Sequence, residues 1–155
     1  GRVPNGSEPR ILEWSGEDVL RRFLLDTGPA ADFVNRRHGA YDRAKQTVGR
    51  GSRIGICVPV LGELWAGVCG SATRNRNEDR LIRRLSDLIV WPYDEAAARR
   101  FGELFAELRR LGRPMQQIDV QIAAIALTLG NCTVVTKDSD FRAVPGLTVE
   151  DWSPP

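Results

Sequence analysis

Short apolar runs alternate with stretches of helical periodicity along most of the chain. Five short runs of mostly apolar residues have the length of buried strands, and they cover residues 23–25, 54–60, 88–91, 133–136 and, more weakly, 147–149. Runs of this kind, lacking a polar face, are typical of strands that are covered on both sides.

The segments between these runs predict helices. The clearest helix opens at Asp94-Glu95 and ends at Gly112, with a stripe of Phe and Leu on one face and Arg109-Arg110 in its last turn, where the helix dipole favours cations. Further helices are predicted for residues 29–38, 61–68, 78–88 and 119–129. Because strands and helices alternate, we expect an α/β fold: a central, mainly parallel sheet of four to five strands with helices on both faces.

A chain of 155 residues favours one domain and can bury a core without disulfides or zinc. Residues 1–20 begin with a stretch rich in Pro and Gly, so we interpret them as an N-terminal extension or a cloning remnant and residues 21–155 as the domain. No apolar run resembles a signal peptide or approaches the ~20 residues of a membrane span. We therefore expect a cytoplasmic protein without membrane association.

The composition restricts the chemistry. Three cysteines are too few and too scattered for a disulfide framework or a zinc site, and one histidine argues against a His-ligated metal or a Ser/His/Asp triad. The net charge of +2 identifies no partner. Residues 119–155, however, hold five acids and only two bases. Any chemistry is therefore expected to depend on carboxylates.

Four acids stand where ligands bind in parallel sheets, outside the carboxyl ends of the strands. Asp26 ends the first predicted strand, and Glu63 lies in the first turn of the helix after the second. Asp119 begins a helix, and Asp138 follows the fourth strand by two residues. Each acid alone has a simpler reading as a helix cap or first-turn dipole partner. Four acids from four separated segments favour one shared site.

Converging carboxylates repel one another unless a cation neutralises them. Mg²⁺ prefers oxygen ligands, and metal sites of this type suit phosphoryl chemistry because the ion activates water and stabilises the leaving oxygen. The residues alone therefore predict a metal-dependent phosphodiester or phosphate hydrolase.

Four motifs carry a family resemblance, which extends from about residue 22 to residue 152. The motifs are Phe-Leu-Leu-Asp-Thr at 23–27, Leu-Gly-Glu-Leu at 61–64 with Gly67, Ile-Asp at 118–119 with Ile-Ala-Ala at 122–124, and Val-Thr-Lys-Asp-Ser-Asp-Phe at 135–141. With these motifs the chain is similar to the PIN-domain ribonucleases, and more narrowly to the VapC-like toxins of type II toxin–antitoxin modules. Residues 144–147, Val-Pro-Gly-Leu, also resemble the family.

This resemblance implies a PIN-like three-layer fold and an endoribonuclease toxin that hydrolyses RNA phosphodiester bonds. It implies Mg²⁺ as the cofactor, with Mn²⁺ able to substitute. It further implies a homodimer and a cognate VapB-like antitoxin that masks the site.

The resemblance also assigns the site. Asp26, Glu63 and Asp119 match the core acids of the family, and Asp138 ranks first as the fourth, ahead of Asp140. All four act as catalytic residues in this assignment, with Asp26, Asp119 and Asp138 as the metal ligands.

The remaining assigned positions are supporting ones. The hydroxyls of Thr27 and Thr136 match positions that support the acids or a bound water, and Asp140 is the reserve acid. The chain departs from the family at Gly28, where Asn is common. This departure removes no acid but can loosen the support of the acids.

Other interpretations make different predictions. A catalytically silent PIN-like interaction module would lack at least one acid, whereas all four positions are filled. An aspartic protease, suggested by Asp26-Thr27-Gly28, requires an all-β chain. A haloacid-dehalogenase-type phosphatase requires a second Asp where Gly28 stands.

The sequence does not identify the RNA-binding residues. One group of basic side chains can either line an RNA groove or serve solubility: Arg36, Arg37, Arg43, Lys45, Arg50 and Arg53.

Overall fold

The computed structural model describes residues 21–155, so the predicted N-terminal extension lies outside the described residues. Its centre is a five-stranded sheet in the order β3-β2-β1-β4-β5, and every neighbouring pair is parallel. The strands are β1 (Arg22–Leu25), β2 (Arg53–Cys57), β3 (Ile89–Trp91), β4 (Cys132–Val135) and β5 (Thr148–Glu150). The predicted α/β fold with a parallel sheet is confirmed.

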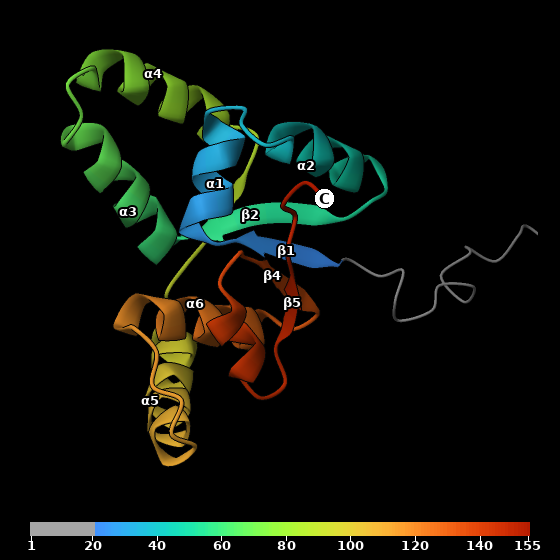
Figure 1. Ribbon diagram of the computed structural model, residues 1–155, viewed down its shortest axis with the longest axis vertical. Helices are drawn as coiled ribbons and strands as arrows, with labels where there is room; N and C mark the ends of the chain where they lie inside the picture. The colour runs from blue at the N-terminus through green and yellow to red at the C-terminus, as the bar shows by residue number, and fades with distance from the viewer. Residues whose placement is uncertain (1–20) are drawn as a thin grey trace, which may run out of the picture.

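Helices cover both faces of the sheet, which gives three layers (Figure 1). On one face lie α1 (Thr27–Val34), α2 (Ala40–Gly49), α3 (Val58–Cys69) and α4 (Arg74–Leu85). On the other face lie α5 (Glu95–Arg110) and α6 (Gln117–Leu129), which pack against each other. A short 3₁₀ helix, η2 (Ser139–Ala143), follows β4.

The core forms on both sides of the central strands. Leu24 of β1, Ile56 of β2 and Val134 of β4 are fully buried, as their apolar runs predict. The stripe on α5 is buried at Leu104 and Leu108, but Leu111 beyond the end of the helix is 56% exposed. None of the helices within residues 21–155 has the length and apolar character needed to cross a bilayer.

Four helices start earlier than predicted: α4 begins at Arg74 instead of residue 78 and α6 at Gln117 instead of residue 119, and the other two starts affect site residues. The apolar run 54–60 is a strand only as far as Cys57, and α3 begins at Val58 with Pro59 in its first turn, where proline is favoured. Glu63 therefore lies in the second turn of its helix, whereas the sequence predicted the first turn. Similarly, α1 begins at Thr27 instead of residue 29, because the side chain of Asp26 caps it.

The sequence reasoning missed α2 entirely. This helix is largely polar, and only Ala40 and Ala44 are buried, so its apolar periodicity is weak. It follows a turn in which Arg36, His38 and Gly39 all have positive φ angles. This turn ends α1 four residues before the predicted end at residue 38.

Candidate active site

The carboxyl ends of β1 and β4 bring the first two site segments together. Leu25 and Val135 are paired in register, so Asp26 and Thr136, the residues after them, stand side by side. The backbone N–H of Asp26 donates to the carbonyl of Val135 over 2.9 Å. Thr136 is 2% exposed and therefore buried at the carboxyl end of β4.

Both carboxylate oxygens of Asp26 accept hydrogen bonds. The backbone N–H of Thr27 donates to Oδ1 over 2.8 Å, and the hydroxyl of Thr136 donates to Oδ2 over 2.7 Å. The first contact caps α1 and the second joins β4 to β1. Asp26 is therefore held in one orientation by groups on two elements.

Asp138 is attached to the same hydroxyl. Its backbone N–H donates to Oγ1 of Thr136 over 3.0 Å, and its own Oδ1 accepts from the N–H of Asp140 over 2.9 Å, which caps η2. Thr136 therefore supports two acids, as the resemblance implies. Asp140 orients Asp138 through its backbone.

Asp119 lies in the first turn of α6 and is half-buried. Its pKa is raised to about 6, first by burial and then by the negative charges of Asp26, Asp138, Glu63 and Asp140, in that order. All the charges that shift this pKa are negative. The three other predicted acids and Asp140 therefore lie near enough to Asp119 for their charges to act on it.

The thiol of Cys57 is a second titratable group whose pKa is affected by these acids. Cys57, the last residue of β2, has its pKa raised to about 11, mainly by burial and to a smaller extent by the charges of Asp26 and Glu63. Glu63 therefore lies near enough to the end of β2 for its charge to act on Cys57, although its helix starts earlier than predicted. Glu63 is exposed, and the site is open to solvent on this side.

The donor set suits a hard cation. Within residues 21–155, no three acidic, His or Cys side chains already stand as a closed group able to hold a metal ion. Mg²⁺ does not need one, because it commonly binds through one or two carboxylates and keeps several waters. Carboxylate oxygens that repel one another, as the raised pKa of Asp119 records, fit such an ion.

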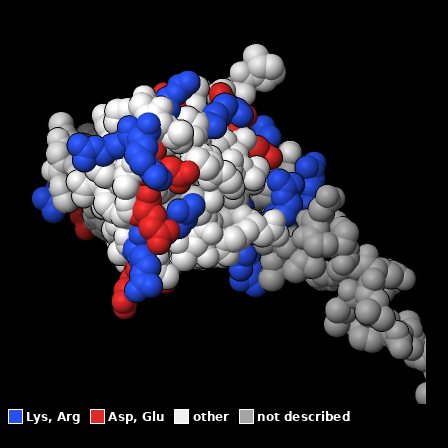
Figure 2. Space-filling model, turned by 90° about the horizontal axis from the view of Figure 1, so that it is seen from below, with Lys and Arg blue, Asp and Glu red and all other residues white. Residues whose placement is uncertain are grey.

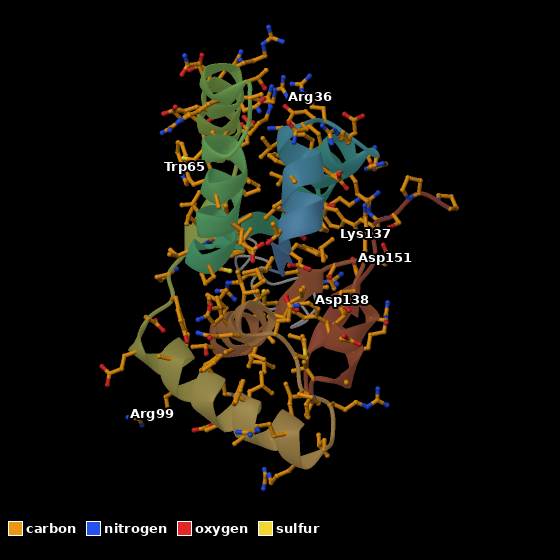
Figure 3. The ribbon with its side chains drawn as sticks, turned by 60° about the vertical axis from the view of Figure 1, so that its left-hand side comes forward. Arg36, Trp65, Arg99, Lys137, Asp138 and Asp151 are labelled. Atoms are coloured by element: carbon orange, nitrogen blue, oxygen red, sulfur yellow. The ribbon has the colours of Figure 1, made fainter. Side chains whose placement is uncertain are left out.

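A groove of about 320 Å³ leads away from Glu63 between α1, α3 and α4. Its floor is apolar, with Ala31 and Val34 from α1 and Leu81 from α4. The groove follows α1 to its end, where Arg37 and Arg80 line it. One end of the groove is therefore acidic and the other basic. Figure 3 views α1, α3 and the Asp138 segment together.

The basic residues singled out from the sequence are exposed but dispersed. Arg43 and Arg50 line a separate hollow of about 550 Å³ beside α2, and Arg36 stacks on the ring of Tyr41 at 4.2 Å. Only Arg37 lines the groove that begins at Glu63. On the side formed by α5, basic and acidic side chains are interspersed around an uncharged area (Figure 2).

The model of the PIN domain family matches residues 23–147. The chain belongs to the PIN domain family. The matched residues span every strand except the last and include all the acids around Asp119.

Two VapC proteins match this PIN domain over nearly their full length. It is 34% identical to the tRNA(fMet)-specific endonuclease VapC of Shigella flexneri over 134 residues, which are 86% of this chain and 100% of the relative. It is 29% identical to ribonuclease VapC2 of Rickettsia felis over 131 residues, 84% of this chain and 97% of the relative.

Two solved structures that match this chain are VapBC structures bound to DNA. The PIN domain matches a chain of VapBC2 from Rickettsia felis bound to a promoter DNA fragment, with a TM-score of 0.79 and 28% identity over 85% of this chain and 99% of that chain. It matches DNA-bound VapBC from Salmonella typhimurium with a TM-score of 0.78 and 32% identity over 86% and 99% of the two chains.

Proposed function

We propose that this PIN domain is the toxin of a VapBC-type module and acts as a metal-dependent endoribonuclease. The observation that carries the proposal is the arrangement of the acids: Thr136 Oγ1 joins Asp26 to the backbone of Asp138, and the charges of both acids act on the half-buried Asp119. A half-buried excess of negative charge destabilises the metal-free protein and is removed by a divalent cation. The ribonuclease names of the relatives support the reaction class.

Mg²⁺ is the proposed cofactor, and Mn²⁺ is its proposed substitute. Asp26, Asp119 and Asp138 would hold the ion, with Glu63 as the fourth catalytic acid. When bound, such an ion activates water and stabilises the charge that develops on a phosphodiester. Thr136 orients Asp26 and Asp138 for this task through its hydroxyl.

The chain itself argues against the other enzyme classes. An aspartic protease reading of Asp26-Thr27-Gly28 needs an all-β chain, whereas α-helices and a parallel sheet make up the described residues. Thr27 and Gly28 belong to α1, which Asp26 caps. A silent interaction module would have no reason to keep four acids at one centre, at a cost in stability.

An RNA cleavage assay tests the proposal. Purified protein is incubated with tRNA, including tRNA(fMet), which the name of the Shigella relative makes the first substrate to try. Cleavage is expected with Mn²⁺ or Mg²⁺, and it should disappear in EDTA and in Asp119→Asn. Asp79→Asn, which changes an exposed acid on α4, is the control and should cleave normally. Cleavage that persists in excess EDTA contradicts the proposal.

The proposed partner is a VapB-like antitoxin. The groove beside Glu63 has the apolar floor and charged ends that suit a peptide segment with an apolar face, and a basic side chain of that segment would meet the acids. The known complexes of the structural neighbours support this assignment. A homodimer in the cytoplasm is proposed on the family resemblance alone.

A further inference from the structure

One carboxylate outside the acid cluster is contacted by a lysine and a histidine. Asp32 of α1 accepts from Nζ of Lys137 at 3.0 Å on Oδ2 and pairs with Nδ1 of His38 at 3.1 Å on Oδ1. The side chain of Asp32 is only 13% exposed, whereas those of its two partners are about half exposed. Burial acts to raise the pKa of Asp32, but the hydrogen bonds and charges of Lys137 and His38 lower it overall.

Lys137 stands between the two residues that organise the acids. Thr136 before it supports Asp26, and Asp138 after it caps η2. The segment 136–138 is therefore fastened to α1 at two places: by Thr136 to Asp26 at the start of the helix, and by Lys137 to Asp32 further along it. Two attachments fix both the position and the direction of a short segment, which one attachment does not.

The contact also keeps a positive charge away from the acids. Lysine is a compact charge on a flexible stem, and one placed next to Asp138 in sequence would readily turn toward a group of carboxylates. In the structure its ammonium faces Asp32, and the charges that shift the pKa of Asp119 are all negative. The acid cluster therefore remains unneutralised.

We propose that Asp32 is a positioning residue, which holds Lys137 so that the segment 136–138 presents Asp138 beside Asp26 and Asp119 and the lysine stays out of the site. This inference rests on the proposed nuclease function. His38 contacts the other oxygen of Asp32, but the proposal rests on the contact with Lys137. Groups that orient metal-binding side chains typically contribute a factor of about 10–100 in activity.

The test compares Asp32→Ala, Lys137→Met and the double variant. Each should lower kcat on RNA by about tenfold or more at saturating Mn²⁺, with KM changed by less than about twofold, because substrate is not touched. The double variant should be no worse than the worse single variant, because both remove one interaction. Lys137→Arg preserves the pair and should restore most of kcat.

A second readout does not depend on activity. The amide of Asp138 donates to Thr136, and its hydrogen exchange reports how well the segment is held. Exchange at this amide should become faster in Asp32→Ala and Lys137→Met. Asp87→Ala is the matched control, because Asp87 likewise pairs with a lysine, Lys45, at 3.4 Å. Neither residue of this pair belongs to an element that carries one of the acids. The control variant should change neither kcat nor this exchange rate.

Three results would overturn the proposal. If Lys137→Met raises KM at unchanged kcat while Asp32→Ala has no effect, Lys137 binds substrate instead. If the losses of the two single variants multiply in the double variant, the residues act independently. If exchange at Asp138 is unchanged in both, the segment is not held by this pair. A wild-type protein that cleaves no RNA would refute the proposed function, and the exchange measurement would still decide the role of Asp32.

Discussion

The hydroxyl of Thr136 donates a 2.7 Å hydrogen bond to Oδ2 of Asp26 across the ends of the two central strands. The same hydroxyl accepts the N–H of Asp138 over 3.0 Å. A hydroxyl carries one proton and two lone pairs, so it can donate one hydrogen bond and accept another at the same time. Here it donates to one acid and accepts from the backbone N–H of the other. This single oxygen atom therefore joins the carboxylate of Asp26 to the backbone of Asp138, although Thr136 and Asp26 are 110 residues apart in sequence.

Replacing Thr136 with Val tests this relationship. The substitution keeps the shape of the buried side chain but removes two partly buried hydrogen bonds, one to the N–H of Asp138 and one to Oδ2 of Asp26, so it should lower the free energy of unfolding by about 1–3 kcal/mol. RNA cleavage should fall as well. Urea unfolding measures the first effect. Thr47→Val, which removes a hydroxyl that only returns to its own helix, should change stability by much less. Equal effects of the two variants would contradict the role assigned to Thr136.

The strands of the sheet and the acids that follow them could be predicted from the sequence, because both depend on local patterns. Apolar runs such as residues 23–25 mark buried strands, and parallel strands place their carboxyl ends at one edge. The acids after those strands must then meet. The starts of α1 and α3 were less accessible, because Asp26 and Pro59 begin helices inside what reads as a strand or a turn.

The pKa of Asp119 predicts how the stability of the metal-free protein depends on pH. A folded-state pKa of about 6, above the ordinary 3.8, means that the folded protein binds this proton more tightly than the unfolded chain. The contribution of Asp119 to the free energy of unfolding therefore falls as pH rises from about 4 to about 6, and then levels off. Asp119→Asn should remove this penalty and raise the Tm at pH 7.5 by a few degrees at most, given about 2–4 °C per kcal/mol.

Thermal unfolding in EDTA at pH 5 and pH 7.5 checks this prediction. The Tm gain of Asp119→Asn should be larger at pH 7.5, where the wild-type carboxylate is charged. Asp26→Asn is the informative comparison, because Asp26 caps α1 and accepts the hydroxyl of Thr136, so it should gain little or lose stability. A drop in Tm for Asp119→Asn at pH 7.5 would mean that Asp119 stabilises the fold.

Other features of the site had no signal in the sequence. Lys137 and Asp32 are separated by 105 residues, and their pairing depends on how α1 lies across β4. The groove beside Glu63 is formed by three helices whose packing follows from side-chain shape rather than from periodicity. Such relationships arise only when the elements have been placed in space.

Gly67 offers a way to block that groove without disturbing the fold. It lines the groove within α3, and a Cβ at this position meets no atom within 4 Å. Gly67→Leu should therefore fold normally while weakening binding of the co-expressed antitoxin, measured by co-purification, by on the order of tenfold or more, since a buried overlap costs ~1–3 kcal/mol. Gly102→Leu, at an equally open position on α5, is the control and should bind normally. Unchanged binding by Gly67→Leu would place the partner elsewhere.

The ends of the RNA products distinguish between two chemistries. If water attacks the phosphorus in line with the departing sugar oxygen, the products carry a 5′-phosphate and a 3′-hydroxyl, and the ribose 2′-hydroxyl is needed only for recognition. Attack by the 2′-hydroxyl instead leaves a 2′,3′-cyclic phosphate and commonly relies on histidine. The one histidine, His38, is bound to Asp32 beyond the end of α1. His38→Ala should therefore keep most of the cleavage, whereas Asp119→Asn should lose more than about 100-fold, beyond the loss expected for an outer partner. Ligation or mass spectrometry of the fragments identifies the ends, and cyclic phosphate termini would refute a carboxylate-dependent hydrolysis.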